Sequence, residues 1–396
     1  MLIRAGVWPK RWRRKGGRSL TGPQRTGKIM IEIWREIVLE SPAFWIGWGG
    51  LAIGFVFGFI VQRTNFCTMG SLSDIMSFGD YRRFRSWMLA IAVAMVGVAL
   101  MQRAGVADFA TSMYLAPNLG WLGNMVGGVL FGIGMVFGGG CVSKNLVRAG
   151  GGDLRSFVVL IVIGLFAYMT IGGLLGPARV ALFGPSMLNL ADSGLETQSM
   201  GDILAALTGL ETGTATTIVL VAFVVGLLAY CFKDAGFRSS PSHLIAGIGI
   251  GLAVLAGWLL TGLAQDDFAD QPVALISLSY VRPTGDTLDY LMRYSALGAP
   301  GFGVVTLLGA LLGAFASAIT SRKFHWATFS DAQDTRRNLF GAALMGIGGV
   351  LALGCTIGQG LTGISTLAVG SLIAVVFIVI GGIVGIKTLE WLLMRE

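Results

Sequence analysis

Long apolar runs separated by short polar stretches dominate the chain. Nine runs approach the roughly 20 residues that a helix needs to cross the hydrocarbon core of a bilayer. They cover residues 44–62, 86–103, 120–138, 157–176, 215–232, 243–263, 299–319, 338–354 and 366–390. Because apolar runs of this length are typical of transmembrane helices, the pattern predicts an all-α integral membrane protein with about nine spans.

One stretch of the sequence occurs twice. Eight residues of an 18-residue window recur, without a gap, 214 positions later. The pairs are Asn124/Asn338, Gly127/Gly341, Leu130/Leu344, Gly132/Gly346, Ile133/Ile347, Gly134/Gly348, Gly140/Gly354 and Cys141/Cys355. We interpret this as an internal duplication, with repeat halves at about residues 44–176 and 215–390.

The positions of the two copies predict how the halves are related. The first copy follows the third apolar run and the second follows the eighth, so the copies would enter the membrane from opposite sides. This is the pattern of an inverted repeat, which many transporters use to place a site near the bilayer midplane. The Gly-Cys turns between runs suit re-entrant loops, since non-helical backbone at membrane depth must line a cavity.

The spacing of glycines indicates close contacts between helices. Small residues four apart let two helix backbones approach each other within a membrane. Such ridges are Gly50/Gly54/Gly58, Gly123/Gly127, Gly309/Gly313 and Gly381/Gly385.

Composition narrows the function classes. The chain is 54% hydrophobic and 13% charged, with a mean hydropathy of +0.74, which is typical of membrane proteins. Its net charge of +8 comes from basic residues between apolar runs, so it indicates the lipid bilayer and not nucleic acid as the partner. The two histidines lie near no cysteine or acidic cluster, and we expect no metal and no cofactor.

The distribution of Lys and Arg predicts the orientation. The loops after the first, third, fifth and seventh runs, with the C-terminus, carry fifteen basic residues, and the opposite loops carry four. By the positive-inside rule the C-terminus is inside and the N-terminus outside. The first 35 residues carry ten basic residues and favour the reverse. We treat 1–43 as a basic tail with a short amphipathic helix at 31–39, with Met30 as an alternative start, and 44–396 as a single transmembrane domain.

Three of the four cysteines lie where apolar runs are interrupted. Cys67, Cys141 and Cys355 stand at such turns, whereas Cys231 lies within a run and suits a small buried hydrophobic residue. Helices that begin after these turns would direct free N–H groups toward a cavity, which favours an anion. A protonated thiol there can donate a weak hydrogen bond. The alternative is that these three cysteines also only fill space in the core.

Three motifs resemble the YeeE/YedE sulfur-transport family. They are Gln-Arg-Thr-Asn-Phe-Cys-Thr-Met-Gly at 62–70, Gly-Cys-Val-Ser-Lys-Asn-Leu-Val-Arg at 140–148 and Gly-Cys-Thr-Ile-Gly-Gln-Gly-Leu-Thr-Gly at 354–363. The resemblance covers about residues 45–390. It implies an inner-membrane importer of thiosulfate or a related inorganic sulfur species, with an hourglass pore in which Cys355, Cys141 and Cys67 pass the ligand along.

Further residues of these motifs are candidates for supporting the pore loops. They are Gly140, Gly354, Lys144, Arg148 and Gln359. Lys144 and Arg148 would balance anion charge in the first copy. The second copy has Gly358 and Thr362 at these positions, so the two entrances of the expected pore would differ in charge.

Two other function classes remain open from the sequence. One is a membrane thiol enzyme, in which paired cysteines relay electrons or sulfane sulfur, and the other is a structural membrane subunit. Transport without catalysis is the leading interpretation, and a cytoplasmic sulfurtransferase is a candidate partner.

Overall fold

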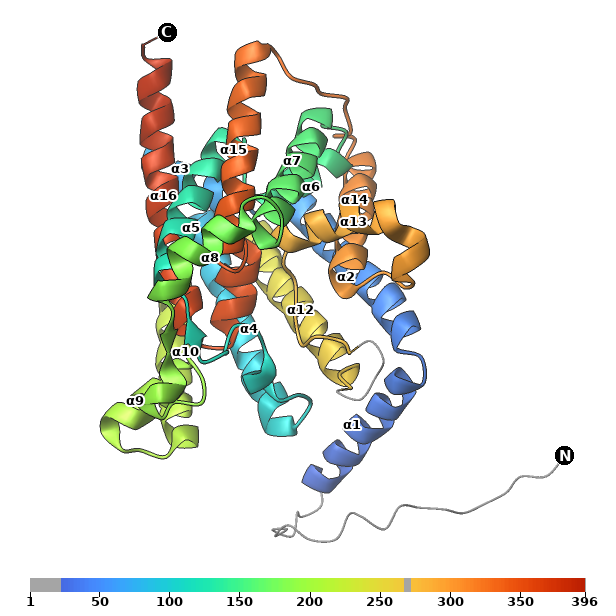
Figure 1. Cartoon of the computed structure of the whole chain (residues 1–396), viewed down its shortest axis with the longest axis vertical. Coiled ribbons are helices and arrows are strands. Elements are labelled where there is room, and N and C mark those ends of the chain that lie inside the picture. Colours follow the sequence, from blue (N-terminus) through green and yellow to red (C-terminus); the bar gives the residue numbers. More distant parts are fainter. Residues whose placement is uncertain (1–22, 267–271, 396) are drawn as a thin grey trace, which may run out of the picture.

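The computed structural model describes residues 23–266 and 272–395, and it is a bundle of long helices (Figure 1). The nine apolar runs all form helices. They are α2 (Pro42–Thr64), α4 (Arg82–Ala104), α5 (Trp121–Phe137), α7 (Leu154–Ile171), α10 (Thr212–Phe232), α12 (Pro241–Leu263), α14 (Phe302–Thr320), α15 (Ala332–Leu351) and α16 (Val369–Leu393).

Shorter elements connect the long helices. The short helices are α1 (Pro23–Glu40), α3 (Thr68–Phe78), α6 (Val142–Gly150), α8 (Gly176–Phe183), α9 (Met200–Thr208), α11 (Ala235–Arg238), α13 (Val281–Leu297) and the π-helical turn η4 (Gly358–Gly363). The 3-10 turns are η1 (Phe109–Thr111), η2 (Gly184–Ser186) and η3 (Leu190–Ser193). Two short strands, β1 (Asn118–Leu119) and β2 (Leu188–Asn189), pair antiparallel.

Eight helical segments of the described chain, and not nine, are long and apolar enough to cross a membrane. The missing one is α15, because Asp334, Arg336 and Arg337 lie in its first two turns. Asp334 is buried and pairs with Arg155 and Arg337. The expected count is therefore one too high by this criterion, although α15 is a full-length helix within the bundle.

The predicted glycine ridges are helix contacts. Helices α2 and α14 run side by side in the same direction, and a Cβ at Gly58 would overlap the carbonyl of Ala310. In return, a Cβ at Gly313 would overlap the carbonyl of Phe55. Because each helix presents glycines to the backbone of the other, the two backbones approach more closely than any side chain would permit.

The duplicated glycines contact each other. In α5 and α15, a Cβ at Gly127 would lie 2.7 Å from the oxygen of Gly348, and one at Gly134 would lie 2.8 Å from the oxygen of Gly341. The earlier glycine of α5 meets the later glycine of α15, and the later glycine of α5 meets the earlier one of α15. The two helices therefore cross antiparallel. The same window of sequence therefore packs against its own repeat.

The remaining contacts also occur in matched pairs. The order α2–α3–α4–α5–α6–α7 corresponds, element by element, to α12–α13–α14–α15–η4–α16. Helix α2 packs on α14 as α12 packs on α4, and α5 packs on α16 as α15 packs on α7. Helix α10 lies outside this correspondence and is the least buried of the eight candidate spans.

The N-terminal prediction is tested only in part. The expected short helix at 31–39 lies within α1, which begins at Pro23. The basic residues of 1–22 lie outside the described residues.

The contact of α2 with α14 predicts a position-specific effect of a single methyl group. Gly58→Ala should destabilise the protein by about 1–3 kcal/mol, because the added Cβ overlaps backbone and the helices must separate. Gly47→Ala in the same helix is the control, since nothing lies within 4 Å of its Cβ position. Thermal unfolding of both variants in detergent measures this, and equal melting temperatures would contradict the packing described.

Candidate functional site

Cys67 and Cys355 begin helical segments in the same way. Cys67 precedes α3, and the N–H of Gly70 donates to its sulfur at 3.4 Å. Cys355 precedes the helical segment that begins at Thr356 and includes η4, and the N–H of Gly358 donates to its sulfur at 3.3 Å. Both stand in the sequence Cys-Thr-x-Gly. The sulfur thus takes the capping role that an oxygen usually has, accepting from the third residue of the helix.

Glycine ends this motif for a packing reason. A Cβ at Gly70 would overlap the guanidinium of Arg83, and one at Gly358 would lie 2.6 Å from the hydroxyl of Ser279. The turns that hold the two sulfurs are therefore tightly packed. Because each sulfur accepts a backbone hydrogen bond, its S–H remains free to donate elsewhere.

Cys141 lies between the other two cysteine turns. It precedes α6, and its sulfur is 3.2 Å from the hydroxyl of Ser143. Its thiol adjoins the thiol of Cys67 on one side and the hydroxyl of Thr356 on another. All three cysteines are buried and free. The structure thus brings the three sequence-predicted cysteines into one cluster.

The turn before each duplicated cysteine contains a residue in the left-handed backbone conformation, at equivalent positions. Gly139 has φ +70° and its counterpart Leu353 has φ +57°. This left-handed conformation is easy for glycine and costly for leucine. A leucine held there indicates that the surrounding structure fixes the turn.

A carboxamide ties each turn to the helix that follows it. Gln359 donates from Nε2 to the carbonyl of Ala352 at 2.5 Å, and Asn145 donates from Nδ2 to the carbonyl of Gly138 at 3.2 Å. Asn145 and Gln359 are themselves 214 positions apart, as are their acceptors. The predicted supporting role of Gln359 fits this contact. Asn145 was not singled out from the sequence, although extending the duplication by four residues identifies it.

The two predicted basic residues belong to the first copy only. Lys144 donates to Oδ1 of Asn65 at 3.0 Å and lies near Cys67 and Cys141. Arg148 donates to the carbonyl of Gly139 at 2.5 Å, so its charge stabilises the turn directly. Positive charge therefore gathers on the side of the cluster that holds Cys67.

Tyr280 also lies against the cysteine turns, and no sequence motif marks it. It immediately precedes α13, as Cys67 immediately precedes α3. The side chain of Tyr280 is completely buried, and its backbone N–H faces the thiol of Cys355.

Cys231 lies apart from this cluster. Its buried thiol donates to the carbonyl of Arg85 at 3.3 Å and packs with Leu89 and Phe237. This agrees with the packing role expected from its position inside an apolar run.

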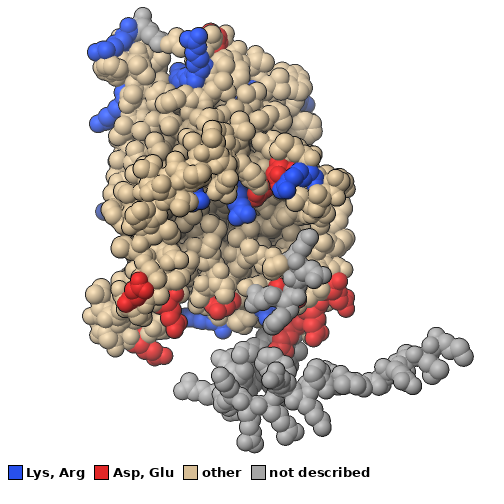
Figure 2. Space-filling view, in the orientation of Figure 1, with Lys and Arg blue, Asp and Glu red and all other residues tan. Residues whose placement is uncertain are grey.

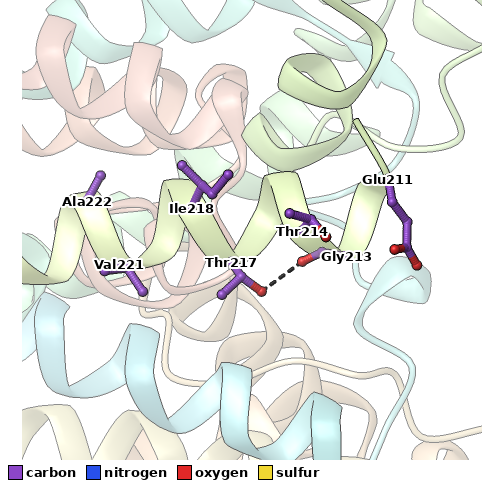
Figure 3. A pocket seen from close by; sticks show the side chains of 7 residues that line it. All are labelled: Glu211, Gly213, Thr214, Thr217, Ile218, Val221 and Ala222. Carbon is purple, nitrogen blue, oxygen red and sulfur yellow. Dashed lines mark hydrogen bonds between the residues drawn. The ribbon is translucent and has the colours of Figure 1, made fainter. Parts of the chain in front are cut away.

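One surface hollow lies away from the cysteines. It has a volume of about 620 Å³ and lies along the start of α10 (Figure 3). It is lined by Glu211, Gly213, Thr214, Thr217, Ile218, Val221 and Ala222. By contrast, the cavity beside Leu353 and Gln359 has only about 10 Å³, about the size of one water probe.

Comparisons with known proteins agree with the motifs. A family model described as sulphur transport matches residues 63–384. The thiosulfate transporter TsuA of Escherichia coli K12 is 28% identical over 79% of this chain and 86% of its own. TsuA of Spirochaeta thermophila is 26% identical over 80% of this chain and 91% of its own. The probable transporter YedE of Salmonella typhimurium is 22% identical over 49% of this chain and 45% of its own. Since the family model covers most of the sequence, the chain belongs to the sulphur transport family.

Proposed function

We propose that this protein imports thiosulfate, or a related small inorganic sulfur anion, across a bacterial inner membrane. The observation that carries the proposal is the cluster of three buried thiols, each at a break between helices, in the interior of a membrane protein of this family. Relatives named as thiosulfate transporters supply the substrate class.

The chemistry of the cluster suits such an anion. Neutral thiols do not repel negative charge, and their polarizable sulfur matches the terminal sulfur of thiosulfate. Cys355 accepts the backbone N–H of Gly358, which leaves its S–H group free to donate to the anion. Lys144 supplies positive charge beside Cys67 and Cys141, and the S–H groups are weak donors that allow the anion to leave.

We propose that the two halves form an inverted repeat whose cysteine turns are re-entrant loops of an hourglass pore. The antiparallel contact of Gly127 with Gly348 and of Gly134 with Gly341 supports a two-fold relation between the copies. The matched pairs α2 with α14 and α12 with α4 support the same relation. Opposite entry of the loops would place Cys355 toward one side of the membrane and Cys67 toward the other.

We propose that the end of the molecule with the C-terminus is cytoplasmic. Lys and Arg side chains gather at the upper end in Figure 2 and Asp and Glu side chains at the lower end, which supports this orientation. Helix α1 and the end of α16 lie at opposite ends of the molecule (Figure 1). An incoming anion would then meet Cys355, Cys141 and Cys67 in that order.

A second candidate function, sulfane-sulfur relay, is favoured by the adjacency of Cys67 and Cys141. In that reaction a thiolate would attack the terminal sulfur of thiosulfate, forming a persulfide and releasing sulfite. Thiosulfate labelled with ³⁵S at either sulfur distinguishes the two. Transport brings both labels into the cell equally, whereas relay brings in the terminal sulfur alone.

The orientation predicts the location of reporters. A reporter fused after Glu396 should be cytoplasmic, and one inserted near Ser193 in η3 should be periplasmic, because the basic loops stay inside. Paired alkaline phosphatase and green fluorescent protein fusions measure both positions. The reverse result at both positions would show that the basic N-terminal tail determines orientation.

The thiol cluster predicts the effect of removing each sulfur. Cys67→Ala, Cys141→Ala and Cys355→Ala should each reduce thiosulfate uptake roughly 10- to 150-fold, because one hydrogen bond to a charged ligand contributes about 1.5–3 kcal/mol. Serine variants should keep part of the activity, since a hydroxyl also donates. Uptake of labelled thiosulfate is measured in cells without other importers.

Cys231→Ala is the matched control for these variants. It also removes a buried thiol, but one in a separate packing cluster, so uptake should stay at the parental level. If Cys141→Ala and Cys355→Ala take up thiosulfate at the parental rate, at equal protein level in the membrane, those two thiols have only a packing role.

A further inference from the structure

Two buried hydroxyl groups on the chain segments around Cys355 have no hydrogen-bond partner among the described residues. They are Oγ1 of Thr356 and the phenolic oxygen of Tyr280. Leaving a buried polar group unpaired costs about 1–3 kcal/mol, and native proteins rarely leave such groups unpaired without a functional reason. Thr356 directly follows Cys355, so its unpaired hydroxyl indicates that something absent from this conformation binds beside the cysteines.

Thr356 lies where the two copies of the cysteine motif meet. It follows Cys355 in the chain, it is 3% exposed, and its hydroxyl adjoins the thiol of Cys141. A group bound at this hydroxyl would therefore be within reach of both cysteines. Thr68 follows Cys67 in the same Cys-Thr-x-Gly motif, and its buried hydroxyl also lacks a partner.

The free hydroxyl of Thr356 is not a general property of this loop. Thr362 donates to the carbonyl of Leu278 at 2.7 Å, and Thr366 donates to the carbonyl of Gly363 at 2.8 Å. Both are buried threonines of the same turn with their hydrogen bonds made to backbone. Thr356 alone of the three keeps its hydroxyl available.

Tyr280 approaches the same cysteine from another element. Its side chain is 0% exposed, and its ring packs on Phe57 with centroids 5.1 Å apart. Its backbone N–H faces the thiol of Cys355, and both Ser279 and the hydroxyl of Tyr114 line the adjacent Gly358. The ring is thus held in place by packing while its hydroxyl remains unpaired.

We propose that the hydroxyls of Thr356 and Tyr280 bind the oxygen end of the transported anion while the thiols of Cys355 and Cys141 contact its terminal sulfur. This assignment rests on the proposed transport function. Hydrogen bonds from hydroxyls to anionic oxygens are short and strong, whereas S–H donors are weak. The site therefore combines strong donors for oxygen with soft groups for sulfur.

The separate roles of the hydroxyls and the thiols define the substrate class. The site fits an anion with a sulfonate-like end and a terminal sulfur, and hydrosulfide, which has no oxygen, would use only the thiols. The two hydroxyls are thus specificity-determining residues, and their removal should affect thiosulfate much more than hydrosulfide.

The experiment compares Thr356→Val and Tyr280→Phe, which delete single oxygens, in the full-length protein. Each should raise the KM for thiosulfate uptake roughly 10-fold or more, since each loses a hydrogen bond to a charged ligand. The concentration of hydrosulfide that halves uptake should change less than twofold. Thr356→Ser should restore the parental KM.

Stability separates binding from a structural role. Because the neighbour of the Thr356 hydroxyl is the weakly accepting thiol of Cys141 and no oxygen or nitrogen pairs with it, Thr356→Val should melt close to the parental temperature. Thr261→Val is the control, since its buried hydroxyl donates to the carbonyl of Ile276, on a different segment, at 2.7 Å. That variant should lose thermal stability and keep the parental KM.

The outcomes distinguish this inference from the function on which it rests. If Thr356→Val and Tyr280→Phe keep a KM within twofold of the parent while Cys141→Ala abolishes uptake, the hydroxyl assignment is wrong and transport stands. If the parent itself takes up no thiosulfate, the proposed function is wrong. A fall in melting temperature without a change in KM would assign the hydroxyls to folding alone.

Discussion

The close approach of helix backbones at glycine is the constraint on which the rest of the structure depends. Helices α5 and α15 cross at Gly127, Gly134, Gly341 and Gly348, where no Cβ separates them. The turns that carry Cys141 and Cys355 follow directly from the ends of these two helices. If the crossing were wider by the thickness of one side chain, the two cysteine turns could not share a site.

Breaking helices inside a membrane protein leaves backbone groups that must be satisfied locally. Here the cysteine sulfurs accept the N–H of Gly70 and Gly358, and the carboxamides of Asn145 and Gln359 satisfy carbonyls on the preceding turns. These are neutral groups with few alternatives for pairing. The same interactions that stabilise the broken helices therefore also orient the thiols toward one another.

The charge distribution around the cluster is asymmetric although its geometry is nearly two-fold. Lys144 and Arg148 lie beside the first copy, and their counterparts Gly358 and Thr362 are neutral. Under the proposed orientation, positive charge would stand on the cytoplasmic side of the thiols and attract an anion inward. The neutral second copy offers hydroxyls in place of charge, so its recognition depends on hydrogen-bond geometry.

The sequence by itself determined the helices, the duplication and the three cysteines, because hydrophobic run length, repeated residues and motif spacing are properties of the chain alone. It overcounted the candidate spans by one, since α15 begins with charged residues that are paired only in the folded state. It gave Asn145 no role, although the repeat register contains it.

Only the tertiary structure decided which groups meet. Tyr280 precedes α13 without any motif around it, and nothing in its sequence context distinguishes it from a buried core tyrosine. Likewise, the sequence does not distinguish the three threonines at 356, 362 and 366. Only the fold shows that the hydroxyl of Thr356 is unpaired, whereas those of the other two are paired. Hydrogen-bond satisfaction depends on contacts between segments far apart in the chain, so no local pattern can encode it.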